Sequence, residues 1–142
     1  MSYKYTDLLD EVHTIALIGA SSNPKKDSYK VMKFLLDYGY DVYPINPKNR
    51  GKKILNRECF ASLDDLEIKI DMIDVFRPST FVYDITKKSI KKRPKIIWTQ
   101  LGIICQKSFD LAKKNGVIFV MDKCPKLELE CRDNTKKEQY GS

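Results

Sequence analysis

The feature of this sequence that most restricts its fold is the alternation of short, unbroken apolar runs with longer segments of helical periodicity. Residues 14–18 form the first apolar run, and Gly19 ends it directly. An apolar run of this length is typical of a parallel strand that is covered on both faces. The alternation therefore predicts an α/β fold, with a doubly wound parallel sheet and helices on both of its faces.

The apolar pattern predicts about five strands. They are expected at residues 14–18, 41–45, 72–76, 95–98 and 117–120. Apolar residues between 31 and 38 recur at helical spacing, and Gly39 is the expected end of that helix. Ser79 is expected to cap the next helix, whereas residues 108–114 should form a third one. The other two predictions are a capped helical turn at 62–66 and a polar loop at 48–60.

Length and composition place the chain among ordinary globular proteins. With 142 residues and no low-complexity linker, one domain is expected over residues 1–132, followed by a polar, disordered tail at 133–142. No apolar run approaches the roughly 20 residues that cross a bilayer, which predicts no membrane association. Residues 1–13 are polar and acidic and show no targeting pattern, so a cytoplasmic protein is expected.

The net charge of +7 admits an anionic partner but does not require one. The densest basic run, residues 87–93, lies where a helix should end, and cations stabilise that end of a helix. The run contains no aromatic residue, so specific nucleic-acid binding is not expected. The oligomeric state stays open.

The cysteines indicate neither a metal site nor a disulfide framework. No two of the four cysteines form a CxxC pair. Cys105 and Cys124 adjoin apolar segments and are interpreted as buried thiols. His13, the single histidine, precedes the first strand. The sequence therefore assigns no metal ligands and no catalytic residues.

Ligands of doubly wound sheets bind outside the carboxyl ends of the strands. The first strand leads into Gly19, Ser21, Ser22, Lys26 and Ser28. A glycine lets the backbone approach a ligand, while hydroxyls and the amides of the next helix can hold a phosphate. Because only one glycine of G-x-G-x-x-G is present, a plain strand-to-helix loop is the alternative.

The loop after the second strand is more informative about the ligand. It begins with Asn46, Pro47 and Lys48, and it holds four cations and no carboxylate up to residue 53. An NAD site usually places an acidic residue here for the ribose hydroxyl. The sequence therefore favours a ligand with an extra ribose phosphate, which both NADP and coenzyme A carry, and a solvated lysine-rich turn is the alternative.

Two further loops follow strands of the same sheet. Phe76 and Arg77 end the third strand, where the arginine would face the crevice and the ring could lie against a base. Gln100, Leu101 and Gly102 follow the fourth strand in a small polar turn that is suited to backbone contact with a ligand. The coincidence of these groups at successive strand ends predicts one binding site.

These loops together resemble those of the small CoA-binding domain proteins, which are similar to the CoA-binding domain of the succinyl-CoA synthetase α subunit. The resemblance runs from about residue 12 to residue 130. It implies a Rossmann-like fold that binds coenzyme A or an acyl-CoA. The segments that carry it are residues 15–31, 43–54, 70–79, 96–103 and 120–128.

The resemblance also implies a part for each loop. Gly19, Ser21, Ser22 and Ser28 correspond to the loop around the pyrophosphate, and Asn46, Pro47 and Lys48 to the segment beside the adenosine, with Lys48 on the ribose 3′-phosphate. Phe76 and Arg77 flank the nucleotide on its other side. Gln100, Leu101 and Gly102 match the turn near the pantetheine arm. Cys124 and Pro125 match a Cys-Pro turn that is interpreted as structural.

The sequence departs from the synthetase in ways that bear on activity. Ser21 and Ser22 replace glycines of its phosphate loop, and His13 lies outside every matching segment. The synthetase also needs a phosphorylated histidine, a second domain and a partner subunit, so ligase activity is not expected. The prediction is a non-catalytic CoA-binding protein. The alternative is an NADP-dependent oxidoreductase on the same fold, for which Tyr29 and the loop lysines are the available proton donors.

Overall fold

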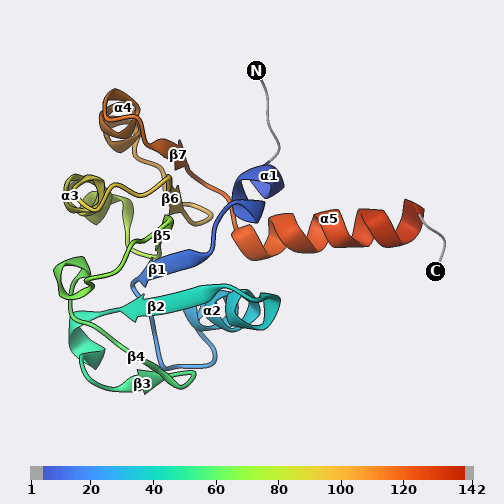
Figure 1. Cartoon of the computed structure of the whole chain (residues 1–142), viewed down its shortest axis with the longest axis horizontal. Coiled ribbons are helices and arrows are strands. Elements are labelled where there is room, and N and C mark those ends of the chain that lie inside the picture. The colour runs from blue at the N-terminus through green and yellow to red at the C-terminus, as the bar shows by residue number, and fades with distance from the viewer. Residues whose placement is uncertain (1–4, 140–142) are drawn as a thin grey trace.

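The computed structural model describes residues 5–139 and has a five-stranded sheet at its centre (Figure 1). All neighbouring strands are parallel, in the order β2-β1-β5-β6-β7. This arrangement confirms the predicted doubly wound, Rossmann-like α/β fold. The strands are β1 (Thr14–Ile18), β2 (Asp41–Ile45), β5 (Met72–Val75), β6 (Ile96–Thr99) and β7 (Ile118–Val120).

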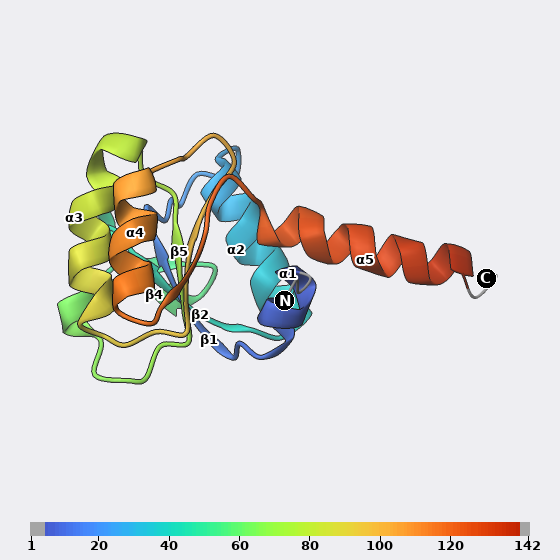
Figure 2. The same ribbon diagram turned by 90° about the horizontal axis from the view of Figure 1, so that it is seen from above.

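Helices cover both faces of the sheet. One face carries α1 (Tyr5–Asp10), α2 (Asp27–Tyr38) and α5 (Pro125–Gln139), and the other carries α3 (Ser79–Ile90) and α4 (Gln106–Lys114) (Figure 2). Because successive side chains of a strand point to opposite faces, each strand contributes to both layers of the core. Met72 and Trp98 pack on the α2 side, whereas Ile73 and Ile97 pack on the α3 side.

The helix predicted to stop at Gly39 does so. Gly39 has a φ of 116°, and the backbone N–H groups there return to the last carbonyls of α2. The predicted turn at 62–66 is the short 3-10 helix η2 (Leu63–Asp65), where Ser62 and Asp65 form a capping box. Both features were readable from sequence because they depend on residues adjacent in the chain.

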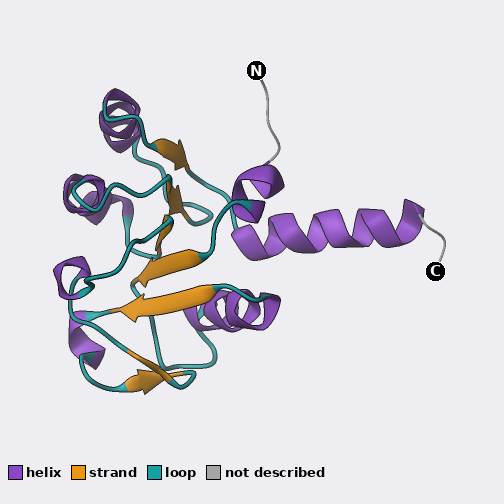
Figure 3. Cartoon of the chain, viewed as in Figure 1, coloured by secondary structure: helices purple, strands orange, loops and turns teal. Residues whose placement is uncertain are grey.

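The segment expected to be a polar loop contains regular structure. It comprises the 3-10 helix η1 (Pro47–Asn49) and a hairpin of β3 (Lys53–Ile54) and β4 (Arg57–Glu58) (Figure 3). Leu55 and Asn56, the two turn residues, have φ values of 50° and 64°, which is the backbone of a type I′ turn. Sequence reasoning missed the hairpin because its strands are very short and leucine is an unusual residue in such a turn.

Two side-chain predictions near α3 and α4 are wrong. Ser79 is the first residue of α3 and does not cap it; the cap position is Pro78, and the Ser79 Oγ instead accepts a hydrogen bond from the Ile104 N–H at 3.2 Å. Cys105 is half-buried rather than buried because it lies at the surface end of α4, whereas Cys124 is buried as predicted.

The polar tail also differs from its expected disorder. Helix α5 continues to Gln139 and extends away from the sheet (Figure 1). Residues 125–139 contain no glycine and no proline after the first position, where proline is well tolerated in a helix. Residues 140–142 of the predicted tail lie outside the described residues. None of the described helices is both long and apolar enough to span a membrane.

Candidate functional site

The sheet order fixes where the chain changes direction. From β1 the chain moves outward to β2 and then crosses to the opposite side of β1 to form β5. Loops that leave β1 and β5 in opposite directions open a crevice between them, the usual ligand position of this sheet order. Gly19 follows β1 and Phe76 follows β5, so two predicted site residues flank that point.

Gly19 brings these two loops into direct contact. Its φ is +88°, and a Cβ at this position would lie 2.5 Å from the Phe76 carbonyl oxygen. The Phe76 N–H donates to the carbonyl of Ile18 at 2.8 Å, which holds the loops together. Only glycine fits both the backbone angle and the available space.

The loop after β1 is tied to the end of β2. The N–H groups of Gly19 and Ala20 both donate to the Ile45 carbonyl, at 3.0 and 3.2 Å. The Asn46 side chain donates from Nδ2 to the Ala20 carbonyl at 2.8 Å and accepts from the Lys48 N–H at 3.0 Å. Asn46 therefore positions both loops, while the amides of Gly19 and Ala20 are already engaged.

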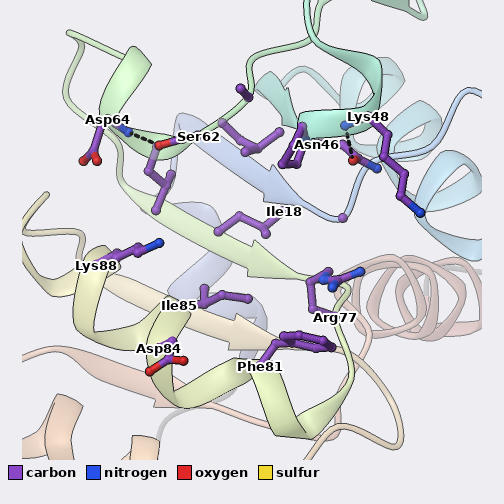
Figure 4. A pocket seen from close by; sticks show the side chains of 15 residues that line it. Ile18, Asn46, Lys48, Ser62, Asp64, Arg77, Phe81, Asp84, Ile85 and Lys88 are labelled. Atoms are coloured by element: carbon purple, nitrogen blue, oxygen red, sulfur yellow. Dashed lines mark hydrogen bonds between the residues drawn. The ribbon is translucent and has the colours of Figure 1, made fainter.

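A first cavity of about 430 Å³ lies over the crevice on the α3 side of the sheet. Ile18 lies between two walls, one carrying Asn46 and Lys48 and the other Arg77 and Phe81 (Figure 4). The Arg77 guanidinium stacks on the Phe81 ring, with 4.3 Å from Cζ to the ring centroid. The walls carry three cations, Lys48, Arg77 and Lys88, and two carboxylates, Asp64 and Asp84. An apolar floor between walls with this excess of positive charge suits a flat ring that carries phosphates.

A second cavity of about 390 Å³ opens on the α2 side, and Arg77 lines both cavities. Its wall includes Phe76, Gln100, Leu101 and Cys124. Gln100 is only 7% exposed, and its Oε1 has no hydrogen-bond partner among the residues that the structure describes. Leu101, by contrast, is 55% exposed at the mouth.

The structure distributes the predicted site residues unevenly. Those that line neither cavity include Gly102, whose N–H donates to the Asp122 carboxylate at 2.7 Å, and Ser28, which is buried in α2. Ser21 Oγ accepts from the Asn23 N–H within its own loop. The first cavity is lined by Gly19, Asn46, Pro47, Lys48 and Arg77, the second by Phe76, Arg77, Gln100 and Leu101, and neither by Ser21, Ser22, Lys26, Ser28 or Gly102.

The sequence did not predict many of the lining residues, including four that are cationic or aromatic. Phe81 and Lys88 of α3 line the first cavity, and Lys30 of α2 and Lys126 of α5 line the second. Lys30 follows Lys26 at the i, i+4 spacing of a helix face, which was a usable signal. The others carried none, because their approach to the crevice depends on how α3 and α5 pack.

Cys59 and Asp74 are buried, titratable residues that line neither cavity. Burial raises the pKa of the Cys59 thiol, whose Sγ donates to the Asn46 carbonyl at 3.6 Å. Burial also raises the pKa of Asp74 well above its usual range, and no described residue hydrogen-bonds to its carboxyl oxygens. No three His, Cys, Asp or Glu side chains among the described residues group as a metal site would require.

The sheet order and the crevice at its switch point define a doubly wound, Rossmann-like α/β domain. Residues 13–130 match the family described as "CoA binding domain". The chain belongs to this CoA-binding domain family. The resemblance seen in the sequence is thereby confirmed.

Relatives of two kinds share this domain. The uncharacterized protein YneT of Bacillus subtilis is 27% identical over 121 residues, which cover 85% of this chain and 88% of YneT. Acetate–CoA ligase (ADP-forming) I subunit alpha of Pyrococcus furiosus is 32% identical over 88 residues, covering 59% of this chain. That match spans only 19% of the ligase subunit.

Solved structures repeat the whole fold. A Thermus thermophilus protein described as cell-free ID.343 has a TM-score of 0.84 and 33% identity, covering 88% of this chain and 93% of that one. A hypothetical protein from Pyrococcus horikoshii OT3 has a TM-score of 0.83 and 33% identity, covering 92% and 96%. In both cases the match covers nearly all of this chain and nearly all of the solved chain.

Proposed function

We propose that this chain binds coenzyme A or an acyl-CoA across the crevice and catalyses no reaction of its own. The observation that carries this proposal is the pair of cavities that meet at Arg77, at the switch point of the sheet. Coenzyme A has two dissimilar halves, a phosphorylated adenosine and a pantetheine arm, which a pyrophosphate joins. Two cavities with a shared arginine match that division.

The first cavity is the proposed adenosine site. Ile18 and Phe81 offer apolar surface to the base, and Lys48 lies on the wall where a ribose 3′-phosphate would be held. Arg77, at the boundary, would pair with the pyrophosphate, since a guanidinium can donate two parallel hydrogen bonds to it. The first turn of α2 lines the second cavity and adds the positive end of a helix dipole on the other side of this boundary.

The second cavity is the proposed site of the pantetheine arm. That arm is largely apolar but contains two amides, and each amide N–H needs an acceptor when buried. The unpaired Gln100 Oε1 supplies such an acceptor. Phe76 and Leu101 provide apolar contact along the arm.

The proposal is tested by calorimetric titration with CoA, dephospho-CoA, NADPH and NAD at one fixed salt concentration. CoA should bind most tightly, and dephospho-CoA more weakly. Binding of NADPH without any response to CoA would replace the proposal with an NADP-dependent enzyme. Heat from none of the four ligands would refute nucleotide binding at this crevice.

Lys48→Ala should weaken CoA binding about tenfold, or about 1.4 kcal/mol, and leave dephospho-CoA binding nearly unchanged. The reason is that Lys48 would contact only the 3′-phosphate, which dephospho-CoA lacks. Lys53→Ala is the matched control, since Lys53 is also exposed but lies in β3 outside both cavities. Equal losses for the two ligands, or for the two variants, would remove Lys48 from this role.

Arg77→Ala should weaken two fragments of the ligand together. Adenosine 3′,5′-bisphosphate and 4′-phosphopantetheine each carry a phosphate at the junction, so each should lose about tenfold or more in affinity. Gln100→Ala should weaken only the phosphopantetheine fragment. If Arg77→Ala affected one fragment alone, the cavities would not share their ligand at Arg77.

A further inference from the structure

The second cavity contains a thiol that the proposed binding of CoA does not use. Cys124 is 6% exposed and lines the same cavity as Gln100. All four cysteines lie in the described part of the chain, and Cys124 is the only one of them that lines one of the two cavities. Cys59 follows β4 and is buried, with its Sγ donating to the carbonyl of Asn46 in the loop after β2. Cys131 is exposed on α5.

The position of Cys124 is fixed from both sides. The Trp98 indole Nε1 donates to the carbonyl of Lys123 at 2.9 Å, and Trp98 itself is fully buried. On the other side, the Glu128 N–H donates to the Cys124 carbonyl at 3.0 Å as α5 begins. The thiol is therefore held at the cavity rather than on a free loop.

A second observation shows that this cavity is built for a ligand. The Gln100 Oε1 lacks a hydrogen-bond partner among the described residues, although the residue is more than nine-tenths buried. An unpaired buried acceptor of this kind is unfavourable, and a hydrogen-bond donor on a ligand would remove that penalty. Lys30, Arg77 and Lys126 line the same cavity, where Asp27 is an opposing charge and Lys126 is ion-paired with Glu130.

We propose that Cys124 captures the sulfur end of the bound ligand as a mixed disulfide with coenzyme A. This inference rests on the proposed function, because the pantetheine arm must lie along Gln100 for its sulfur to approach Cys124. Coenzyme A ends in a thiol, so the ligand and the wall of its own cavity would carry matching reactive groups. The chain would then hold CoA covalently under oxidising conditions and release it on reduction.

The step is a thiol–disulfide exchange with a mixed disulfide of CoA and glutathione. Cys124 loses its proton to solvent, and its sulfur attacks the CoA sulfur. The bond between CoA and glutathione breaks as the bond between Cys124 and CoA forms. Glutathione leaves as a thiolate and takes up a proton. One disulfide replaces another, so the exchange consumes no oxidant.

The test is intact-mass analysis, without reductant, of the full chain after incubation with the CoA–glutathione disulfide. One CoA adduct per chain should form at Cys124, located by peptide mapping, and dithiothreitol should remove it. Binding of the CoA portion should make adduct formation at least about tenfold faster than with oxidised glutathione. Excess adenosine 3′,5′-bisphosphate should slow the reaction by competing for the adenosine site.

Matched variants separate this inference from the proposed function. Cys124→Ser should abolish the adduct and keep CoA affinity within about threefold, whereas Cys131→Ser should react like the parent chain. Calorimetric CoA binding without an adduct, or with an adduct at Cys131, would overturn the role of Cys124 alone. Absence of CoA binding in the parent would overturn both. If Cys124→Ser fails to fold, the parent chain still tests the proposal. Adenosine 3′,5′-bisphosphate should slow adduct formation at Cys124, and an unchanged rate in its presence would overturn the proposal.

Discussion

Replacing Gly19 with alanine should lower the free energy of unfolding by about 2–4 kcal/mol and remove CoA binding. Two costs combine at this residue. The φ of +88° is unfavourable for any residue with a Cβ, and the added carbon would lie 2.5 Å from the Phe76 carbonyl oxygen. Backbone atoms cannot rotate away, so the β1 and β5 loops must separate, and the crevice between them would change shape.

Gly51→Ala is the matched control, and urea unfolding is the measurement. Gly51 has a similar φ of +77°, but a Cβ there would meet nothing within 4 Å. It should therefore show the cost of the backbone angle alone, about 1 kcal/mol. Equal destabilisation by the two variants would show that the contact between Gly19 and Phe76 does not restrict the loops.

The second large effect is expected at Asp74, in the middle of β5. The residue is fully buried between Leu17 and Trp98 of the neighbouring strands, and burial raises the pKa of its carboxyl group well above the usual range. The folded chain therefore keeps a proton that the unfolded chain releases above its ordinary pKa of 3.8. Asp74→Asn should make the protein more stable at pH 7 by at least about 1 kcal/mol.

The pH dependence gives the sign of this effect. The stabilising contribution of a group with a raised pKa is complete below pH 3.8 and is lost as the pH rises toward the folded value. Over that interval the free energy of unfolding of the parent should fall by roughly 1.4 kcal/mol per pH unit relative to Asp74→Asn. Urea unfolding at pH 4, 5, 6 and 7 measures the difference, and parallel curves would contradict a protonated Asp74.

Asp71, three residues earlier, is a control of opposite sign. Burial acts to raise its pKa, but the N–H groups of His13 and Thr14, at 2.9 and 3.2 Å, and two nearby lysines outweigh that and lower it. A lowered pKa stabilises the folded chain above pH 3.8 and ceases to do so as the pH falls through the folded value. Asp71→Asn should therefore destabilise the protein at pH 7 and have less effect in acid.

Local sequence was sufficient for much of the fold. The predicted bounds of β1 and β2 coincide with those observed, because each is an apolar run that a glycine or an Asn-Pro pair ends. The hairpin of β3 and β4 escaped prediction, since its pairing involves two residues on each strand. The helical tail was also missed, because polar composition by itself does not separate a solvated helix from a disordered segment.

The sequence by itself determined that polar and cationic residues follow each strand of a parallel sheet. That placement is local, since a strand's end and the loop after it are adjacent in the chain, and it put Asn46, Arg77 and Gln100 at one edge. Only the tertiary structure decided that Gly19 touches Phe76, that Arg77 lines two cavities and that Cys124 lines the same cavity as Gln100. These contacts join residues that are far apart in sequence. They arise from the order of the strands and the packing of the helices, and both depend on burial of apolar surface over the whole chain.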